Sequence, residues 1–441
     1  MNNNQSLLSG KYSFIKEKGG AKTSLFWFSL ELPHHKQTMN KSTFFTGQPI
    51  FTQIVKFLPR TIILNAARQF NADRYCKKFD SYHHLITMLY ACYQHCTSLR
   101  EVSTGMGACE GRLQSLGVRY LPARSTLAEA NKRRSYQVFE KIYYSLYERY
   151  KHVLPDSRSD RLSKKLVIID STTISLFKEI LENAGRRNID GKKKGGIKVH
   201  MAVRAHEDVP YLVDLTKASQ ADVSFLQKLH VPEHSVLVMD RGYNNFKKFH
   251  QWSGEKINWV ARTRVNVVIE VKKERSVSDE EKQCGVLSDQ NIVMGFKNNA
   301  IQQVKCRLVR YYDAETDKTF EFITNNYRWK PSKVAAIYKR RWQIELLFKR
   351  LKQNMPLQYF LGDNENAVKV QIYCALIADL LLKVILQGVK RKWAFSNIAC
   401  LVRLHLMNYT DLRKFLENPD RSRIFNPVPN LNPQLTLNLS G

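Results

Sequence analysis

Two apolar, β-branched runs that each end in an aspartate constrain the fold of this chain more than any other feature. The run "KKLVIID" ends at Asp170 and the run "SVLVMD" ends at Asp240. Between them lie the strand-like runs "GIKVHMAVRAH" and "YLVDLTKA" and the helix-like run "DVSFLQKLH". This order of three strands, a helix and a fourth strand predicts an α/β domain.

The ends of the two aspartate-bearing runs predict a candidate site. Ligands of open α/β sheets gather at the carboxyl ends of strands, and neighbouring strands lie about 4.8 Å apart. If the two strands are neighbours, the carboxylates of Asp170 and Asp240 reach the same pair of cations, and oxygen ligands favour Mg²⁺ or Mn²⁺ over zinc. Taken alone, each aspartate is more simply explained as a helix N-cap or a turn residue.

A third acidic residue lies in the basic segment "YKRRWQIELLFKRLKQ", which predicts one helix. At about 100° per residue, four side chains share a polar stripe beside an apolar face. They are Tyr338, Arg341, Glu345 and Lys352. The stripe combines a carboxylate for a metal with a phenol and two cations for phosphates. A ladder of surface ion pairs among Arg341, Glu345 and Lys349 is the alternative, but it leaves the other stripe positions unexplained.

The balance of charge predicts a polyanionic partner. The 441 residues include 70 Lys and Arg against 39 Asp and Glu, which gives a net charge of +31. The basic residues are spread along the chain, so we expect the folded body to carry the positive surface and to bind nucleic acid. A solvated charged face, or a protein of the membrane surface, is the alternative.

The cysteines and the apolar segments favour a reduced, cytoplasmic protein without a membrane span. The eight Cys form no regular disulfide framework, and buried thiols explain Cys92 and Cys96 better than a metal knuckle does. The most apolar run, at residues 370–386, contains Asp379 and Lys383. It therefore predicts a buried helix rather than a transmembrane one.

The N-terminal third of the chain is expected to hold two different parts. Residues 1–47 form a loose extension, within which Met39 is an alternative start, and residues 48–155 have helical periodicity. Two helices around the turn "LGVRYLPARS" in this second part fit a DNA-binding helix-turn-helix. An ordinary helical hairpin fits their spacing equally well.

The rest of the chain is expected to hold the α/β domain and a tail. The α/β domain covers residues 156–390 and contains a β-rich insertion at about 256–325, indicated by runs such as "QVKCRLVRYYD" and "KTFEFITNN". The α/β pattern then resumes with the helix that carries Glu345. Residues 391–441 form a helical segment and a tail.

Three motifs, taken in order, resemble the signatures of a known family. They are "DSTT" from Asp170, "DRGY" from Asp240, and a Tyr-x2-Arg-x3-Glu-x6-Lys pattern from Tyr338 to Lys352. Together they resemble bacterial insertion-sequence transposases of the DDE class, specifically the group named for its Tyr-Arg-Glu-Lys motif. The resemblance covers about residues 160–390, and the helical part before it looks like the N-terminal domain of one branch of these transposases.

The resemblance implies a fold and a set of site residues. The α/β domain would be an RNase H-like catalytic domain, interrupted by the β-rich insertion and preceded by an all-α DNA-binding domain. Asp170, Asp240 and Glu345 would be catalytic residues that bind two Mg²⁺ or Mn²⁺ ions. DNA contacts would come from five further side chains: Tyr338, Arg341, Lys352, Arg241 and Lys198.

The resemblance also implies an aromatic residue of the insertion that holds a flipped base. Phe320, in "TFEFITNN", is the first candidate, and Trp259 and Trp329 compete with it. A core aromatic explains any one of them more simply. Lys198 and His200 are expected either to face the acidic residues from the second strand or to serve the structure alone.

The implied activity is cut-and-paste transposition. The enzyme would bind the terminal inverted repeats of its insertion sequence, excise the element from double-stranded DNA and join it to target DNA, as a homodimer in a synaptic complex. An RNase H-like nuclease or resolvase shares the acidic triad but does not require the Tyr-Arg-Lys stripe. A DNA-binding protein without catalysis does not require the triad at all.

Overall fold

The computed structural model describes most of the chain between residues 47 and 419. The described residues are 47–118, 120–154, 160–175, 185–187, 193–263, 267–295, 303–355, 357 and 359–419. The expected N-terminal extension, apart from residue 47, lies outside them together with the alternative start at Met39. The end of the expected tail, from residue 420, also lies outside them.

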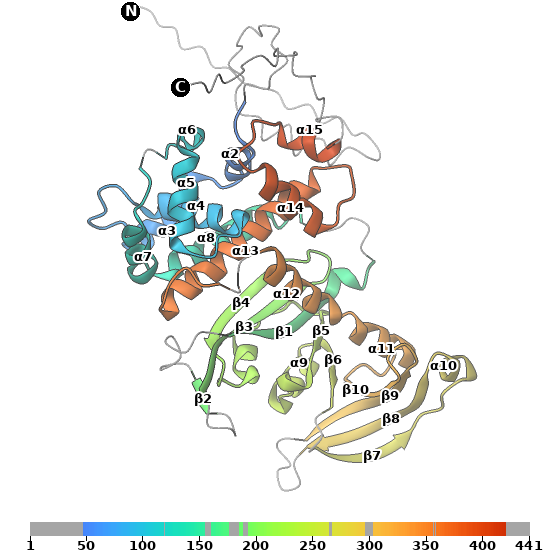
Figure 1. Ribbon diagram of the computed structural model, residues 1–441. Coiled ribbons are helices and arrows are strands. Elements are labelled where there is room, and N and C mark those ends of the chain that lie inside the picture. Colours follow the sequence, from blue (N-terminus) through green and yellow to red (C-terminus); the bar gives the residue numbers. More distant parts are fainter. Residues whose placement is uncertain are drawn as a thin grey trace, which may run out of the picture.

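Helices from both ends of the described chain pack into one helical body (Figure 1). The first helices are α2 (Ile50–Val55), α3 (Arg60–Gln69), α4 (Ser81–Gln94), α5 (Leu99–Ala108), α6 (Glu110–Leu113), η1 (Gln114–Leu116), α7 (Arg124–Arg133) and α8 (Tyr136–Tyr150). The last are α13 (Glu365–Gln387), α14 (Phe395–His405) and α15 (Leu412–Glu417). The backbone N–H of Phe51 donates to the carbonyl of Leu406 at 2.8 Å, so the chain's last helices close the body that its first helices begin.

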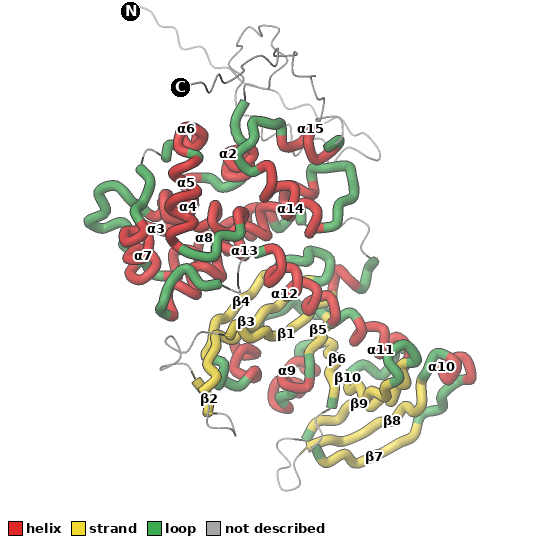
Figure 2. Tube along the Cα trace, in the orientation of Figure 1, coloured by secondary structure: helices red, strands yellow, loops and turns green. Residues whose placement is uncertain are grey.

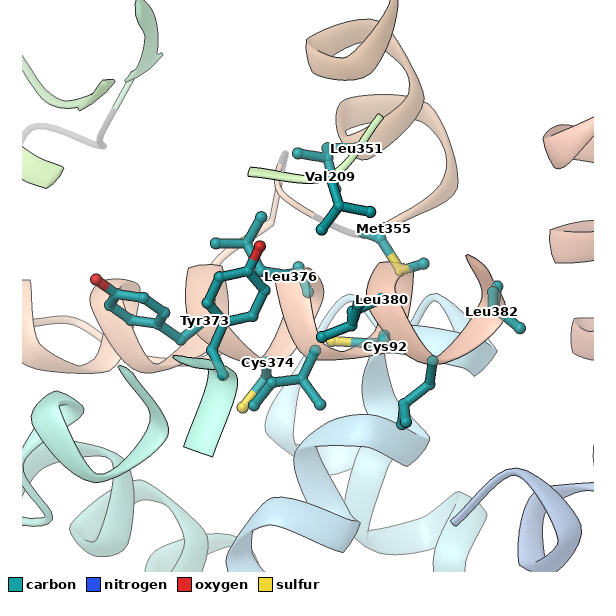
Figure 3. Packing of buried hydrophobic residues seen from close by; sticks show 14 of the residues in the cluster. Cys92, Val209, Leu351, Met355, Tyr373, Cys374, Leu376, Leu380 and Leu382 are labelled. Carbon is teal, nitrogen blue, oxygen red and sulfur yellow. The ribbon is translucent and has the colours of Figure 1, made fainter. Parts of the chain in front are cut away.

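The long helix α13 lies at the centre of this helical body. Its side chains are apolar on all sides, and a helix of this kind is buried. Figure 3 shows Leu376 and Leu380 of α13 packed near Leu351 and Met355, with Cys92 of α4 in the same cluster. The prediction that the most apolar run of the sequence is a buried helix is confirmed. None of the helices in the described ranges is both long enough and apolar enough to cross a membrane.

One sheet runs through the α/β part and continues into the insertion (Figure 2). Its strands follow the order β2-β3-β1-β5-β6-β10-β9-β8-β7, and β4 pairs with β3 outside this path. The strands are β1 (Leu166–Ser175), β2 (Gly185–Arg187), β3 (Lys193–Arg204), β4 (Pro210–Lys217), β5 (Val236–Met239), β6 (Asn258–Arg262), β7 (Val268–Glu274), β8 (Val286–Gly295), β9 (Val304–Asp313) and β10 (Lys318–Thr324). The short helix η2 (Ser163–Lys165) precedes β1. Four other short helices lie between later strands: η4 (Asp222–Gln227), η5 (Arg241–Tyr243), α9 (Phe246–Gly254) and α10 (Asp279–Gln283).

The strand order β4-β3-β1-β5-β6 is that of an RNase H-like fold. The strands β1, β3 and β4 pair antiparallel, whereas β5 and β6 run parallel to β1. The predicted fold class, a helical region followed by an RNase H-like domain with a β-rich insertion, is confirmed. The strand β6, expected within the insertion, is the fifth strand of the core sheet, and β10 pairs with it so that the insertion extends the same sheet.

Two helices, rather than the single predicted one, carry the basic segment around Glu345. They are α11 (Pro331–Lys339) and α12 (Trp342–Asn354). Between them the N–H of Arg341 donates to the carbonyl of Tyr338, three residues earlier, at 2.8 Å. This tighter hydrogen bond interrupts the regular α-helix, so the single-helix prediction is wrong.

Alternation along the strands gives the sheet two different faces. Ile168 of β1 belongs to the apolar cluster that includes Ile344 of α12. Its neighbour Ile169 belongs to a second cluster, which includes Phe225 of η4 and Phe249 of α9. We call these surfaces of the sheet the α12 face and the η4 face.

Candidate active site

The register of β1 and β5 places two aspartates side by side. Ile169 lies opposite Met239 in this parallel pair. The next residues, Asp170 and Asp240, therefore lie on adjacent segments, and alternation puts both on the α12 face. The condition on which the candidate site depended, that the two strands are neighbours, is met. However, β1 continues to Ser175 alongside β3, so Asp170 lies within its strand and not at the end of it, as the sequence had suggested.

The helix α12 brings Glu345 over these aspartates. Ile344 and Leu347 are fully buried, which fixes the rotation of the helix and leaves Glu345 half-buried in its first turn. The guanidinium of Arg341 donates through Nη1 to Oδ2 of Asp170 and through Nη2 to Oε1 of Glu345, both at 2.5 Å. Carboxylates far apart in the sequence therefore share one cation.

The other two residues of the basic motif also reach this group. The hydroxyl of Tyr338 donates to Oδ1 of Asp240 at 3.2 Å. The Nζ of Lys352 donates to Oγ1 of Thr172 at 2.7 Å, and Thr172 follows Asp170 by two residues on the same face of β1. Although the helix is interrupted, the four motif side chains meet around the two aspartates.

A pocket of about 430 Å³ opens beside Asp170 and Glu345. Its lining consists of Asp170, Ser171, Thr172, Glu345, Phe348, Lys349, Lys352 and Gln353. Lys349, which the alternative interpretation placed in a ladder of surface ion pairs, lines this pocket. Of that ladder the structure contains the pair of Glu345 with Arg341, four residues earlier, but this pair is partly buried and is shared with Asp170.

Burial makes the carboxylate of Asp170 costly to ionise. Its side chain is 15% exposed. Burial raises the pKa of Asp170 to about 6, against the lowering effect of Arg341, and the charges of Asp240 and Glu345 raise it further. Burial likewise raises the pKa of Tyr338, so its phenol remains a hydrogen-bond donor at neutral pH. A carboxylate in this state is stabilised by any cation placed beside it.

The donor set fits a divalent metal. Asp170, Asp240 and Glu345 supply carboxylate oxygens, the ligands that Mg²⁺ and Mn²⁺ prefer. Within the described ranges, no three His, Cys, Asp or Glu side chains form a ready-made metal cage. The guanidinium of Arg341 lies between two of the acids and supplies the positive charge that a metal would otherwise supply.

Arg262 is a site residue that sequence reasoning missed. Met239 of β5 lies opposite Ala261 of β6, so Arg262 is the neighbour of Asp240 on the α12 face. Its Cζ lies 5.2 Å from the centre of the Phe320 ring. The available signal was the run "INWVAR", which ends in a charged residue just as the two aspartate-bearing runs do.

The three candidate aromatics have different surroundings. Phe320 is half-buried and stacks on Phe322, whose ring centre is 4.7 Å from that of Tyr338. Trp259 is fully buried and stacks on Phe249 at 4.1 Å, as a core residue does. Trp329 is half-buried, and the Nζ of Lys333 lies 6.0 Å from the centre of its ring. The role of Phe320 in holding a base stays a prediction. Its ring lies near Arg262, which is the neighbour of Asp240.

Lys198 and His200 lie on the other side of the sheet. Lys198 pairs with Thr173 and His200 with Ser171, residues of β1 that alternate with Asp170, so both side chains occupy the η4 face. The prediction that they face the acidic residues is therefore wrong. Arg241, the residue after Asp240, is exposed. Contacts of Lys198 and Arg241 with DNA stay predictions.

The helices proposed for a helix-turn-helix are α5 and α7. Between them lie α6 and η1, whereas the turn of a helix-turn-helix has about three or four residues. The pair is therefore not a tight helix-turn-helix. DNA binding by the helical region stays a prediction.

Comparisons with known proteins match most of the described chain to family models and to relatives. The family model described as "Transposase DDE domain" matches residues 161–381, and that of a domain of unknown function (DUF4372) matches residues 46–119. The y4zB protein of Sinorhizobium fredii, named as a transposase, is 28% identical over 71% of this chain and 82% of its own length. A Synechocystis protein, named as a transposase for insertion sequence element IS4SA, is 28% identical over 59% of this chain and 71% of its own length.

A solved structure is also similar, although distantly. The cryo-EM structure of a piggyBac transposase synaptic complex with hairpin DNA has a TM-score of 0.41 at 10% sequence identity. The likeness covers 84% of this chain and 81% of that one. At this score it supports no conclusion about the chain.

Proposed function

Because the chain belongs to the transposase DDE domain family, we propose that it moves an insertion sequence by cut-and-paste transposition. It binds the terminal inverted repeats of the element, excises the element and joins it to target DNA. The chain is thus a DDE transposase, and within that class we place it in the group with the Tyr-Arg-Glu-Lys signature. Relatives named as transposases for the insertion sequence elements IS4SA and IS5377 support the assignment to insertion-sequence transposases. The placement in the group rests on the spacing of Tyr338, Arg341, Glu345 and Lys352.

The observation that carries the proposal is the meeting of three acidic residues from distant parts of the chain. Asp170, Asp240 and Glu345 come from β1, the end of β5 and α12, and a single arginine lies among them. We propose them as ligands of two Mg²⁺ or Mn²⁺ ions. When bound, such a pair activates the attacking hydroxyl and stabilises the leaving oxygen of an in-line displacement.

The basic motif residues hold the DNA in this proposal. Arg341 neutralises part of the carboxylate charge in the structure. When divalent cations take over that task, its fork of N–H donors is available for a DNA phosphate. Tyr338 and Lys352 then add a hydroxyl and an ammonium donor on either side of the acids.

Further contacts are proposed at the rim of the site. Arg262 and Phe320 form a cation and an aromatic surface next to Asp240, suited to a phosphate and to an unstacked base. Arg241, the exposed residue after Asp240, is proposed as an additional backbone contact, whereas any contact of Lys198 with DNA would lie on the η4 face. The net charge of +31 is consistent with a long DNA footprint, and joining two element ends requires a homodimer in a synaptic complex.

The test is a reaction with DNA that carries both ends of the element, in Mg²⁺ or Mn²⁺. We expect nicked and joined products from the wild-type chain, and neither product from Asp170→Asn, Asp240→Asn or Glu345→Gln. The matched control is Asp214→Asn, since Asp214 pairs with Lys228 away from the site. Activity retained in any of the three variants would contradict the site assignment.

The same reaction separates the rival functions. A nuclease or resolvase without strand transfer would give nicks but no joined product. A DNA-binding protein without catalysis would give neither, while still retarding the DNA in a gel.

A further inference from the structure

A second polar cluster lies behind the acidic residues, on the η4 face of the sheet. Asp222, the first residue of η4, accepts through Oδ1 from the Nζ of Lys198 at 3.0 Å and from the hydroxyl of Ser171 at 3.2 Å. Ser171 follows Asp170, and its own backbone N–H donates to Oδ1 of Asp170 at 2.8 Å. One oxygen of Asp222 is therefore joined to the segment that carries the first catalytic aspartate.

The other oxygen of Asp222 packs against the segment that carries Asp240. A Cβ added to Gly242 would lie 2.8 Å from Oδ2 of Asp222, which is closer than real Cβ contacts allow. Gly242 stands two residues after Asp240, and only a residue without a side chain leaves room for the carboxylate here. The two oxygens of Asp222 thus lie against the two segments that carry Asp170 and Asp240.

A buried histidine completes the cluster. His200 is fully buried, with Nδ1 at 3.0 Å from the hydroxyl of Tyr243 and Nε2 at 3.0 Å from Oγ1 of Thr216. Its ring stacks on Phe225 of η4 at 5.4 Å. The rings of His200 and Tyr243 therefore lock η4 against β3 and against η5, which follows Asp240. These contacts hold η4, and with it Asp222, against the neighbouring elements.

We propose that Asp222 is a positioning residue, which fixes the separation of Asp170 and Asp240 by holding their two segments from the opposite face of the sheet. The inference rests on the proposed function, because it assumes that the two aspartates share metal ions. Metal ligands depend on such outer contacts, whose loss typically weakens metal binding about 10–100-fold. A carboxylate is suited to this position because Lys198 balances its charge, and because Oδ1 accepts from Ser171 while Oδ2 packs against Gly242.

The first experiment measures the binding of Mn²⁺ alone to the full-length chain by calorimetry. We expect Asp222→Ala to weaken Mn²⁺ binding about 10-fold or more, while far-UV circular dichroism stays that of the wild type. Asp222→Asn, which keeps an acceptor for Ser171 but loses the charge opposite Lys198, should give a smaller loss. Asp214→Ala is the matched control, because it removes another Asp–Lys pair from the same part of the molecule and should leave Mn²⁺ binding unchanged.

The second experiment is a double-mutant cycle between Asp222 and Gly242. Gly242→Ala should weaken Mn²⁺ binding in the wild-type background because the new methyl group displaces the carboxylate of Asp222. In the Asp222→Ala background the same substitution should have almost no further effect, since the obstructing oxygen is absent. A role in overall stability alone would change the melting temperature and leave the metal affinity untouched in both backgrounds.

Two outcomes would overturn the inference, and they are distinguishable. If Asp170→Asn weakens Mn²⁺ binding but folded Asp222→Ala and Asp222→Asn bind as the wild type does, Asp222 does not position the site. If Asp170→Asn itself leaves Mn²⁺ binding unchanged, the metal site of the proposed function fails, and the positioning role fails with it.

Discussion

Two arginines, one in the β insertion and one at the candidate site, show how differently a charged cluster can be built. Arg307 of β9 is fully buried, and its Nε and Nη2 donate to the two oxygens of Asp289 at 2.7 and 2.8 Å. Its Nη1 donates to the carbonyl of Trp329 at 2.6 Å. All three nitrogens of Arg307 are therefore satisfied by partners of fixed geometry.

Arg341 at the candidate site is satisfied only in part. Its two terminal nitrogens donate to different carboxylates, on Asp170 and Glu345. Its Nε is buried and has no hydrogen-bond partner among the described residues. The charge of Asp240 acts on Asp170 as well, so a third acidic residue lies close by. The closed cluster of Arg307 stabilises a fold, whereas the open cluster of Arg341 has excess negative charge that a metal would neutralise.

The largest effect on stability is expected from the closed cluster. Arg307→Ala leaves Asp289 buried with Arg275 as its one remaining ion-pair partner among the described residues. The variant should lower the free energy of unfolding by about 3–5 kcal/mol. Chemical denaturation measures this loss. The double variant Arg307→Met with Asp289→Leu should recover much of it, because apolar residues replace both members of the pair. If Arg307→Ala were as stable as the wild type, the Arg307 cluster would not stabilise the fold.

At the open cluster of Arg341, removal of a charged side chain is expected to raise the free energy of unfolding instead of lowering it. The pKa of Asp170 is raised to about 6, above its ordinary value of 3.8, so the folded state binds the proton more tightly than the unfolded state does. The metal-free protein is therefore most stabilised by this group below about pH 4, and loses that stability as the pH rises through about 6. Asp170→Asn should raise the free energy of unfolding at pH 7 by about 2 kcal/mol in chelator.

The control for this prediction is Mn²⁺. Saturating Mn²⁺ should stabilise the wild-type chain, because a ligand that binds only the folded state shifts the equilibrium toward it. It should stabilise Asp170→Asn much less. If the two proteins had equal free energies of unfolding in chelator, at pH 7 and at pH 4, the pKa of Asp170 would not be raised in the folded state.

A smaller effect, on binding, is expected from Arg341 itself. Arg341→Ala removes the cation that competes with a metal, so the DNA-free chain should bind Mn²⁺ several-fold more tightly. The same variant should bind DNA more weakly, with a salt dependence reduced by about one phosphate contact. Calorimetry and DNA binding at several salt concentrations measure the two effects. A loss of both affinities would assign Arg341 to structure, like Arg307.

The smallest effect is expected from an exposed pair in the insertion. Arg310 and Glu321 lie 3.4 Å apart, with side chains 50% and 42% exposed. Arg310→Ala should change the free energy of unfolding by about 0.5 kcal/mol or less, because water screens such pairs. A larger loss, comparable with that of Arg307→Ala, would mean that pairing rather than burial decides the stability of the insertion.

Much of the candidate site could be predicted from local patterns. Apolar runs that end in Asp170 and Asp240 predicted two adjacent strands, and the spacing of Tyr338, Arg341, Glu345 and Lys352 grouped four side chains that do meet. The apolar composition of α13 predicted its burial. These features depend on the period of side chains along a helix or strand, which the order of residues determines directly.

Other features could not be read from local patterns. The interruption between α11 and α12 lies in the segment "YKRRW", which contains no Pro or Gly that would mark it. The continuation of β1 beyond Asp170 depends on the presence of β3 beside it. The place of Arg262 next to Asp240 depends on the register of β5 and β6.

The sequence by itself determined which residue types alternate, where strands and helices form, and which acids and bases share a motif. Only the tertiary structure decided that Lys198 faces Asp222 rather than Asp170, and that one arginine serves two carboxylates. The physical reason is the two-residue period of a strand: a shift of one residue in the pairing moves every side chain to the other face. That pairing is set by hydrogen bonds between segments far apart in the chain, which no local pattern contains.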